Sequence, residues 1–112
     1  MAELLPEPFV SFTRDYAAVA RAYDALGKVC AEAGPLDEKT RELIKLGMAI
    51  GGRLEGAVHA HARRALSAGA TPEELRHVVV MAVPTVGFPT TVAAFTWVAD
   101  VLGAKGKRNG RR

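Results

Sequence analysis

The sequence contains one cysteine and no long uncharged apolar run, and each shortage excludes a class of protein. Cys30 cannot form a disulfide within its own chain, so the protein is not a disulfide-stabilised secreted domain and fits a reducing compartment. No uncharged apolar stretch reaches the length of a membrane span, so we expect no membrane association. The start, MAELLPEPFV, has no basic region and does not resemble a signal peptide. We therefore expect a cytoplasmic protein.

Acidic residues are missing from the C-terminal stretch GAKGKRNGRR. This stretch holds five of the chain's 15 basic residues, so the net charge of +3 arises there, and the part up to Leu102 has ten basic and twelve acidic residues. We predict a helical domain over 1–102 and a flexible basic tail over 103–112. Five charges among glycines are weak evidence for nucleic-acid binding. The stretch ALSAGATPEEL has the spacing of a helix-turn-helix, but its second helix begins Pro-Glu-Glu, which would repel phosphates, so we expect no nucleic-acid partner.

Apolar and polar residues do not alternate at period two, and the pattern is helical throughout. With 49% hydrophobic residues among 112, the chain can form one domain with a core. Asp37 is an expected helix N-cap, Thr71 and Glu74 form an expected capping box, and Gly69 follows an expected helix end. We predict an all-α fold of five or six helices. They cover about 8–34 (as one helix or as two joined near 14–16), 38–52, 54–68, 72–83 and 89–102.

The stretch VVVMAV, residues 78–83, is apolar on every side of its predicted helix. A helix with one face in water would not show this pattern. We therefore expect both faces to be covered, one of them by another subunit.

Two of the three histidines, His59 and His61, lie two positions apart on the predicted helix 54–68. Such residues are about 200° apart around a helix axis, so they face different sides. His59 has Glu55 four residues before it and Arg63 four after it, and we interpret it as part of a solvated charge pair. No other Cys, Asp, Glu or His lies three or four residues from either histidine, so we expect no metal site on this helix. His77 is expected at the surface or an interface.

His61 and Glu42 are the candidate catalytic residues. His61 shares its helix face with small apolar residues, and Glu42 shares its face with Leu46, so both should point inward. The turn Gly51-Gly52 joins their helices, and the two residues lie about ten positions before it and about eight after it. At 1.5 Å rise per residue they reach similar depth in a helical hairpin. A buried carboxylate needs a partner, so we predict a Glu42–His61 acid/base pair facing an alanine-lined pocket.

The segments TRELIKLGMAIGG, HARRALSAGATPEEL and VGFPTTVAAF follow one another between Leu36 and Leu102. In this order they resemble the carboxymuconolactone decarboxylase family, which includes the alkylhydroperoxidase D-like proteins. The resemblance implies an all-helical subunit that assembles into a homo-oligomer, a trimer or hexamer, with the active site near or between subunits.

The alkylhydroperoxidase-like branch of this family has a Glu, then Cys-x-x-Cys, then a His four residues after the second Cys. Glu42 and His61 match the Glu and the His, but Leu54 and Ala57 occupy the cysteine positions. Neither residue can form a thiolate, so the resemblance does not imply a dithiol peroxidase. Cys30 lies on the apolar stripe of another helix, where we expect a buried structural thiol.

The cysteine-free branch includes the lactone decarboxylase, and VHAHARRALSAG is similar to its LH.R.AL..G stretch. This resemblance implies a carbon–carbon lyase that acts on a small carboxylate or lactone without metal or cofactor, with His61 delivering a proton and Glu42 orienting it. Thr85-Val86-Gly87 replaces a Tyr-x-Gly of the decarboxylase, and Ser67-Ala68 replaces its Asn-Asn, so the substrate does not carry over. The alternatives are a redox protein that has lost the dithiol and a non-catalytic helical oligomer.

Overall fold

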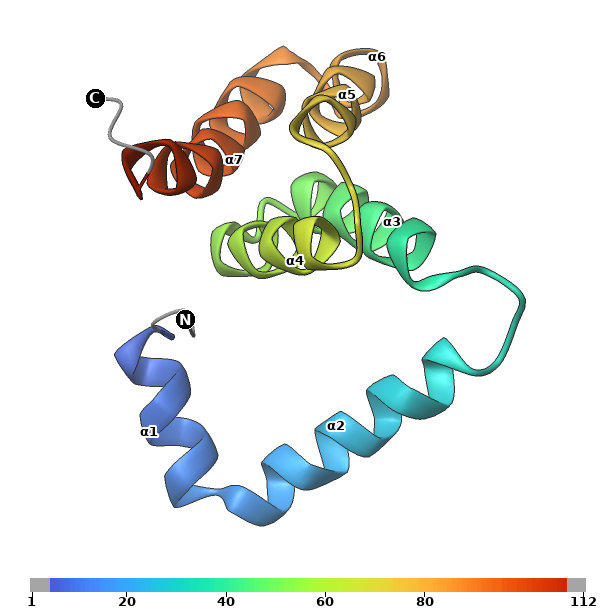
Figure 1. Ribbon diagram of the computed structural model, residues 1–112, viewed down its shortest axis with the longest axis vertical. Helices are drawn as coiled ribbons and strands as arrows, with labels where there is room; N and C mark the ends of the chain where they lie inside the picture. Colours follow the sequence, from blue (N-terminus) through green and yellow to red (C-terminus); the bar gives the residue numbers. More distant parts are fainter. Residues whose placement is uncertain (1–4, 109–112) are drawn as a thin grey trace. The chain divides into compact units, whose positions relative to one another are not determined.

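The computed structural model describes the backbone of residues 5–108 and the side chains of residues 5–103. Within 5–108 the chain forms helices and no strand, which confirms the predicted all-α class (Figure 1). Among the described residues six helices have nine or more residues, and the seventh, α6, has four and lies where the predicted helix 72–83 ends and before the predicted start at 89. The helices are α1 Glu7–Asp15, α2 Ala17–Ala31, α3 Glu38–Gly51, α4 Glu55–Ser67, α5 Pro72–Met81, α6 Val83–Val86 and α7 Phe88–Arg108.

The chain divides into two compact units. The sequence predicts one domain over 1–102. We call Met1–Pro35 the N-terminal unit and Leu36–Arg112 the main unit. The division falls at Gly34-Pro35, where glycine and proline end the helical path. Neither α1 nor α2 contains a buried residue, so the apolar stripe of α2 does not contribute to the core.

For residues 8–34, predicted as one helix or as two joined near 14–16, the structure has two helices, which meet at Tyr16. The backbone leaves the helical region there, at φ −124° and ψ 55°, while the Tyr16 N–H still donates to the Phe12 carbonyl at 2.8 Å. The rings of Phe12 and Tyr16 lie 5.2 Å apart between centroids.

Cys30, near the end of α2, is exposed, so the expectation of a buried thiol is wrong. The reason is that the whole α2 stripe is exposed, as Tyr23 at 71% and Leu26 at 59% show.

Helices α3 and α4 of the main unit lie side by side as a hairpin (Figure 1). The Asp37 carboxylate accepts a hydrogen bond from the Thr40 N–H at 2.9 Å and caps the start of α3, as predicted. Helix α3 ends at Gly51, and Arg53 completes the short turn in a left-handed conformation with φ 54°. This tight connection keeps the two helices in contact.

The core of the main unit lies between the α3–α4 hairpin and helices α5 and α7. Its largest fully buried side chains are Leu46, Ile50, Val58, Leu75, Val79 and Val98. The predicted capping box starts α5, with the Thr71 side chain and the Glu74 side chain each bonded to the other residue's N–H. Gly69, with φ +104°, ends the turn after α4 in a conformation that side chains rarely adopt.

Two expectations concern the cover of α5 and the end of α7. Within one chain only one side of α5 is covered, because Val79 is buried while Val80 and Met81 are exposed, so the expected cover by another subunit stays a prediction. Helix α7 continues to Arg108, so residues 103–108 of the predicted tail are helical, and 109–112 lie outside the described residues. None of the helices in the described part of the chain is long and apolar enough to cross a membrane.

Candidate active site

The side chains of His61 and Glu42 are in direct contact across the α3–α4 hairpin. His61 Nδ1 lies 2.8 Å from Glu42 Oε1. The two side chains are 18% and 12% exposed, so the pair is mostly, but not completely, removed from water. The structure thus brings together the two residues that the sequence singles out.

Each partner is held by the packing of its own helix. Glu42 lies on the buried face of α3, one turn before Leu46. His61 lies next to Ala62 on α4, and both Ala62 and Ala65 are completely buried against the core. Because these small residues pack closely, they fix the position from which the imidazole extends.

The geometry determines which nitrogen of His61 is available for chemistry. An ionised carboxylate can only accept hydrogen bonds, so the Nδ1 that faces Glu42 carries the hydrogen. Nε2 has no hydrogen-bond partner within residues 5–103. A histidine held in this way can exchange a proton at Nε2 with a bound molecule, while the carboxylate stabilises the charged ring.

Lys45 is a charged neighbour of the pair that the sequence reasoning missed. Its Nζ lies 3.9 Å from Glu42 Oε2, on the oxygen that His61 does not use, and the Lys45 side chain is 41% exposed. The i,i+3 spacing of Glu42 and Lys45 on one helix was the available signal. The site therefore contains a carboxylate, an imidazole that can carry a proton and a partly exposed positive charge.

His59 has a different partner from the one expected. Its Nε2 lies 3.2 Å from Oδ2 of Asp100 on α7, and the His59 side chain is 26% exposed. The interpretation of His59 as a solvated partner of Glu55 and Arg63 missed this contact, because it comes from a helix 41 residues away that packs against α4. His77 on α5 is exposed, which agrees with its expected surface position.

Hydrogen bonds at two helix starts help to hold α3 and α5 in place. Hydrogen bonds from the side chain and the backbone N–H of Thr40 lower the pKa of Asp37. The backbone N–H of Thr71 and the Lys39 ammonium lower the pKa of Glu74. Lys39 Nζ lies 3.0 Å from Glu74 Oε2, so this ion pair joins the start of α3 to the start of α5. Both contacts involve the start of α3, the helix that carries Glu42.

A carboxylate and an imidazole held between two helices of an all-α domain define a helical protein with a candidate acid/base pair. The sequence pattern of the carboxymuconolactone decarboxylase family matches residues 17–100, which include both members of the pair. The chain belongs to the carboxymuconolactone decarboxylase family. With one cysteine in the whole sequence, it lacks the Cys-x-x-Cys pair.

Two similar proteins extend this result. An uncharacterised protein of Haemophilus influenzae is 44% identical over 57 residues, which are 51% of this chain and 50% of that protein. The chain thus spans about half the length of this relative. The crystal structure of an apo carboxymuconolactone decarboxylase family protein from Legionella pneumophila matches with a TM-score of 0.74 and 25% identity, over 86% of each chain.

Proposed function

We propose that this protein is an acid/base carbon–carbon lyase of the decarboxylase type, acting on a small carboxylate or lactone. The observation that carries the proposal is the 2.8 Å contact between His61 Nδ1 and Glu42 Oε1, which occupies Nδ1 while Nε2 has no hydrogen-bond partner within residues 5–103. His61 is the catalytic residue because Nε2 exchanges the proton with the substrate. Glu42 is a positioning residue because it acts through the imidazole.

The proposed step needs only a proton and a place for negative charge. The electron pair of the bond to the carboxylate moves into a conjugated lactone carbonyl, CO₂ leaves, and a dienolate remains. The dienolate carbon then takes a proton from Nε2–H of the His61 imidazolium, which later regains a proton from water. The Lys45 ammonium is exposed enough to turn toward the lactone oxygen and stabilise its negative charge.

The test uses carboxymuconolactone and related small lactone carboxylates, with CO₂ release as the readout. His61→Gln should lower kcat by about 10²- to 10⁴-fold, the usual contribution of a general acid. Glu42→Gln should lower kcat with little change in KM, because it disturbs the orientation of the imidazole and leaves substrate binding intact. His77→Gln, a change of the exposed histidine on α5, serves as the matched control and should keep full activity.

The proposal fails if His61→Gln turns over substrate as fast as the unaltered protein. It also fails if the unaltered protein decarboxylates none of these compounds, since the proposal states that the protein acts on this class of substrate. Circular dichroism on each variant shows whether the helices are retained, so that loss of fold is not taken for loss of chemistry.

A redox function has one observation in its favour, the exposure of Cys30. A dithiol mechanism needs a second thiol, and Leu54 and Ala57 occupy the family's cysteine positions on the main unit. We therefore place a redox function second to the lyase function. We propose that the protein is cytoplasmic and that Cys30 is reduced there. Thiol titration of the native protein decides: a Cys30 that reacts no faster than a free cysteine would exclude the redox function.

We also propose that the protein assembles as a homo-oligomer, a trimer or hexamer. The support is the number of large apolar side chains that one chain leaves exposed on the main unit, among them Met48 at 69%, Phe88 at 66% and Phe95 at 57%. An apolar groove adds to this surface, lined by Gly47, Ile50, Val78, Met81, Ala82, Thr85 and Val86. Sedimentation equilibrium gives the mass directly, and a monomer at micromolar concentration would contradict the proposal.

A further inference from the structure

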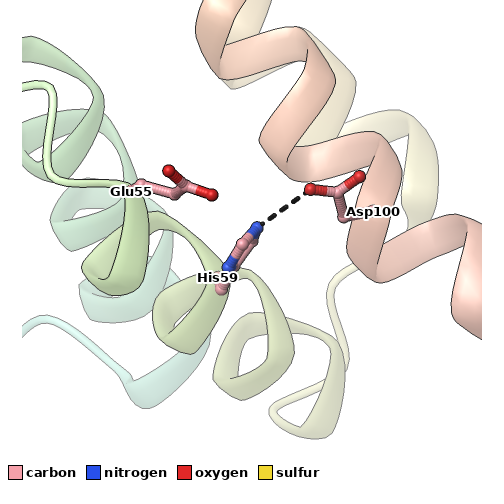
Figure 2. A group of neighbouring side chains, drawn as sticks. All are labelled: Glu55, His59 and Asp100. Atoms are coloured by element: carbon pink, nitrogen blue, oxygen red, sulfur yellow. Dashed lines mark hydrogen bonds and ion pairs between the residues drawn. The ribbon is translucent and has the colours of Figure 1, made fainter. Parts of the chain in front are cut away.

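A second group of chemically active side chains lies on the opposite side of α4 from His61. Glu55 and His59 are one turn apart on α4, and Asp100 comes from α7 (Figure 2). Each residue offers one ligand atom, and these atoms all lie within 4.8 Å of one another. Figure 2 shows the two carboxylates pointing toward each other, with the His59 ring below and between them.

We propose that Glu55, His59 and Asp100 bind a single divalent transition-metal cation, for which zinc is the probe. The site joins α4 to α7 and is separate from the His61–Glu42 pair, so it does not depend on the proposed lyase activity. The sequence pattern offers only two of the three ligands, Glu55 and His59, and the fold supplies the third, Asp100.

The donor set favours this class of cation. Zinc binds imidazole nitrogen and carboxylate oxygen at similar distances, and imidazole also suits iron, copper and nickel, whereas calcium and magnesium select oxygen ligands. The three groups carry a net charge of −2 when the imidazole is neutral, which a divalent cation balances. The i,i+4 spacing of Glu55 and His59 places both side chains on one face of α4.

The distances require little movement. Ligands about 2.0–2.2 Å from one cation lie roughly 3–3.6 Å apart when they occupy neighbouring positions. His59 Nε2 and Asp100 Oδ2 are already 3.2 Å apart. Glu55 is exposed and lies in the first turn of α4, so its side chain is free to rotate toward them. Asp100 is 57% exposed, which leaves water access for the remaining coordination positions.

The experiment is a calorimetric titration of the full chain with zinc after chelator treatment. Cys30→Ser is the background, because it removes the chain's only thiol as a competing ligand. We expect one zinc ion per chain. Loss of a residue that supports a ligand costs about 10- to 100-fold in known sites, so loss of a ligand should weaken binding at least about tenfold. The ligand variants are Glu55→Gln, His59→Gln and Asp100→Asn.

His61→Gln is the matched control, because it removes a histidine two residues from His59 on the same helix but on another face. It should bind zinc as the background does, and so should His77→Gln. At the same zinc concentration, zinc should also raise the melting temperature of the background protein more than that of Asp100→Asn, because the substitution weakens the link between α4 and α7.

Three results would overturn the inference. The first is no stoichiometric binding, which would make the group an ion pair only. The second is equal affinity in the three ligand variants, which would place the cation elsewhere. The third is loss of binding in His61→Gln alone, which would move the site to the candidate active site.

Discussion

The contact between His61 and Glu42 predicts a measurable coupling energy in folding. His61 Nδ1 lies 2.8 Å from Glu42 Oε1, and the two side chains are 18% and 12% exposed. Hydrogen bonds to charged groups contribute about 1.5–3 kcal/mol when buried. The residual exposure reduces this figure, so we expect a coupling energy of about 1–2 kcal/mol between the two residues.

A double-mutant cycle measures this energy. The free energy of unfolding is determined near neutral pH by urea denaturation, followed by circular dichroism, for His61→Ala, Glu42→Ala, the double variant and the unaltered protein. All four are compared at one protein concentration, because assembly would make stability depend on concentration. The stability losses of the two single variants should together exceed the loss of the double variant by this coupling energy, since each single variant leaves a mostly buried partner unpaired.

The pair His59 and Asp100 gives the internal comparison. It is longer, at 3.2 Å, and its side chains are 26% and 57% exposed, so its metal-free coupling energy should be below about 1 kcal/mol. The reasoning is refuted if the His61–Glu42 cycle gives less than about 0.5 kcal/mol, or if the more exposed pair couples more strongly.

Three further predictions concern the framework around the site. Leu46→Ala, at a fully buried position, should lower the free energy of unfolding by about 2–5 kcal/mol in urea, and a loss below about 1 kcal/mol would show that Leu46 is not a core residue. Gly69→Ala should lower the free energy of unfolding by about 1 kcal/mol or more because φ is +104° there. Gly56→Ala lies inside α4 with open space around it and should raise the free energy of unfolding by up to about 1 kcal/mol. A change of the same sign in both variants would contradict this prediction. Hydrogen bonding from Thr40 lowers the pKa of Asp37, so the stability that Asp37 adds is present above the ordinary aspartate pKa and is lost as pH falls through the lowered folded value. Asp37→Asn should therefore flatten the acid side of the melting temperature against pH, and an unchanged slope would disprove the contribution.

Local signals in the sequence determined the longer helices of the main unit and several of their ends. The Asp37 cap, the Thr71–Glu74 capping box and the turn at Gly69 all form as predicted, because each depends on residues within one helical turn. The Glu42–His61 contact was also predictable, since a short turn fixes how two consecutive helices pair. For these features, neighbouring residues along the chain are neighbours in space.

Only the tertiary structure decided the features that join distant segments. Asp100 reaches His59 because α7 packs against α4, and no spacing rule connects positions 41 residues apart. Cys30 is exposed and the chain divides at Pro35 because no other part of the described chain covers the apolar face of α2. The apolar stripe of α2 has the same period as a buried stripe, so the sequence could not reveal this. Periodicity determines that a helix has an apolar face, whereas burial depends on what packs against that face, and this is a property of the whole fold.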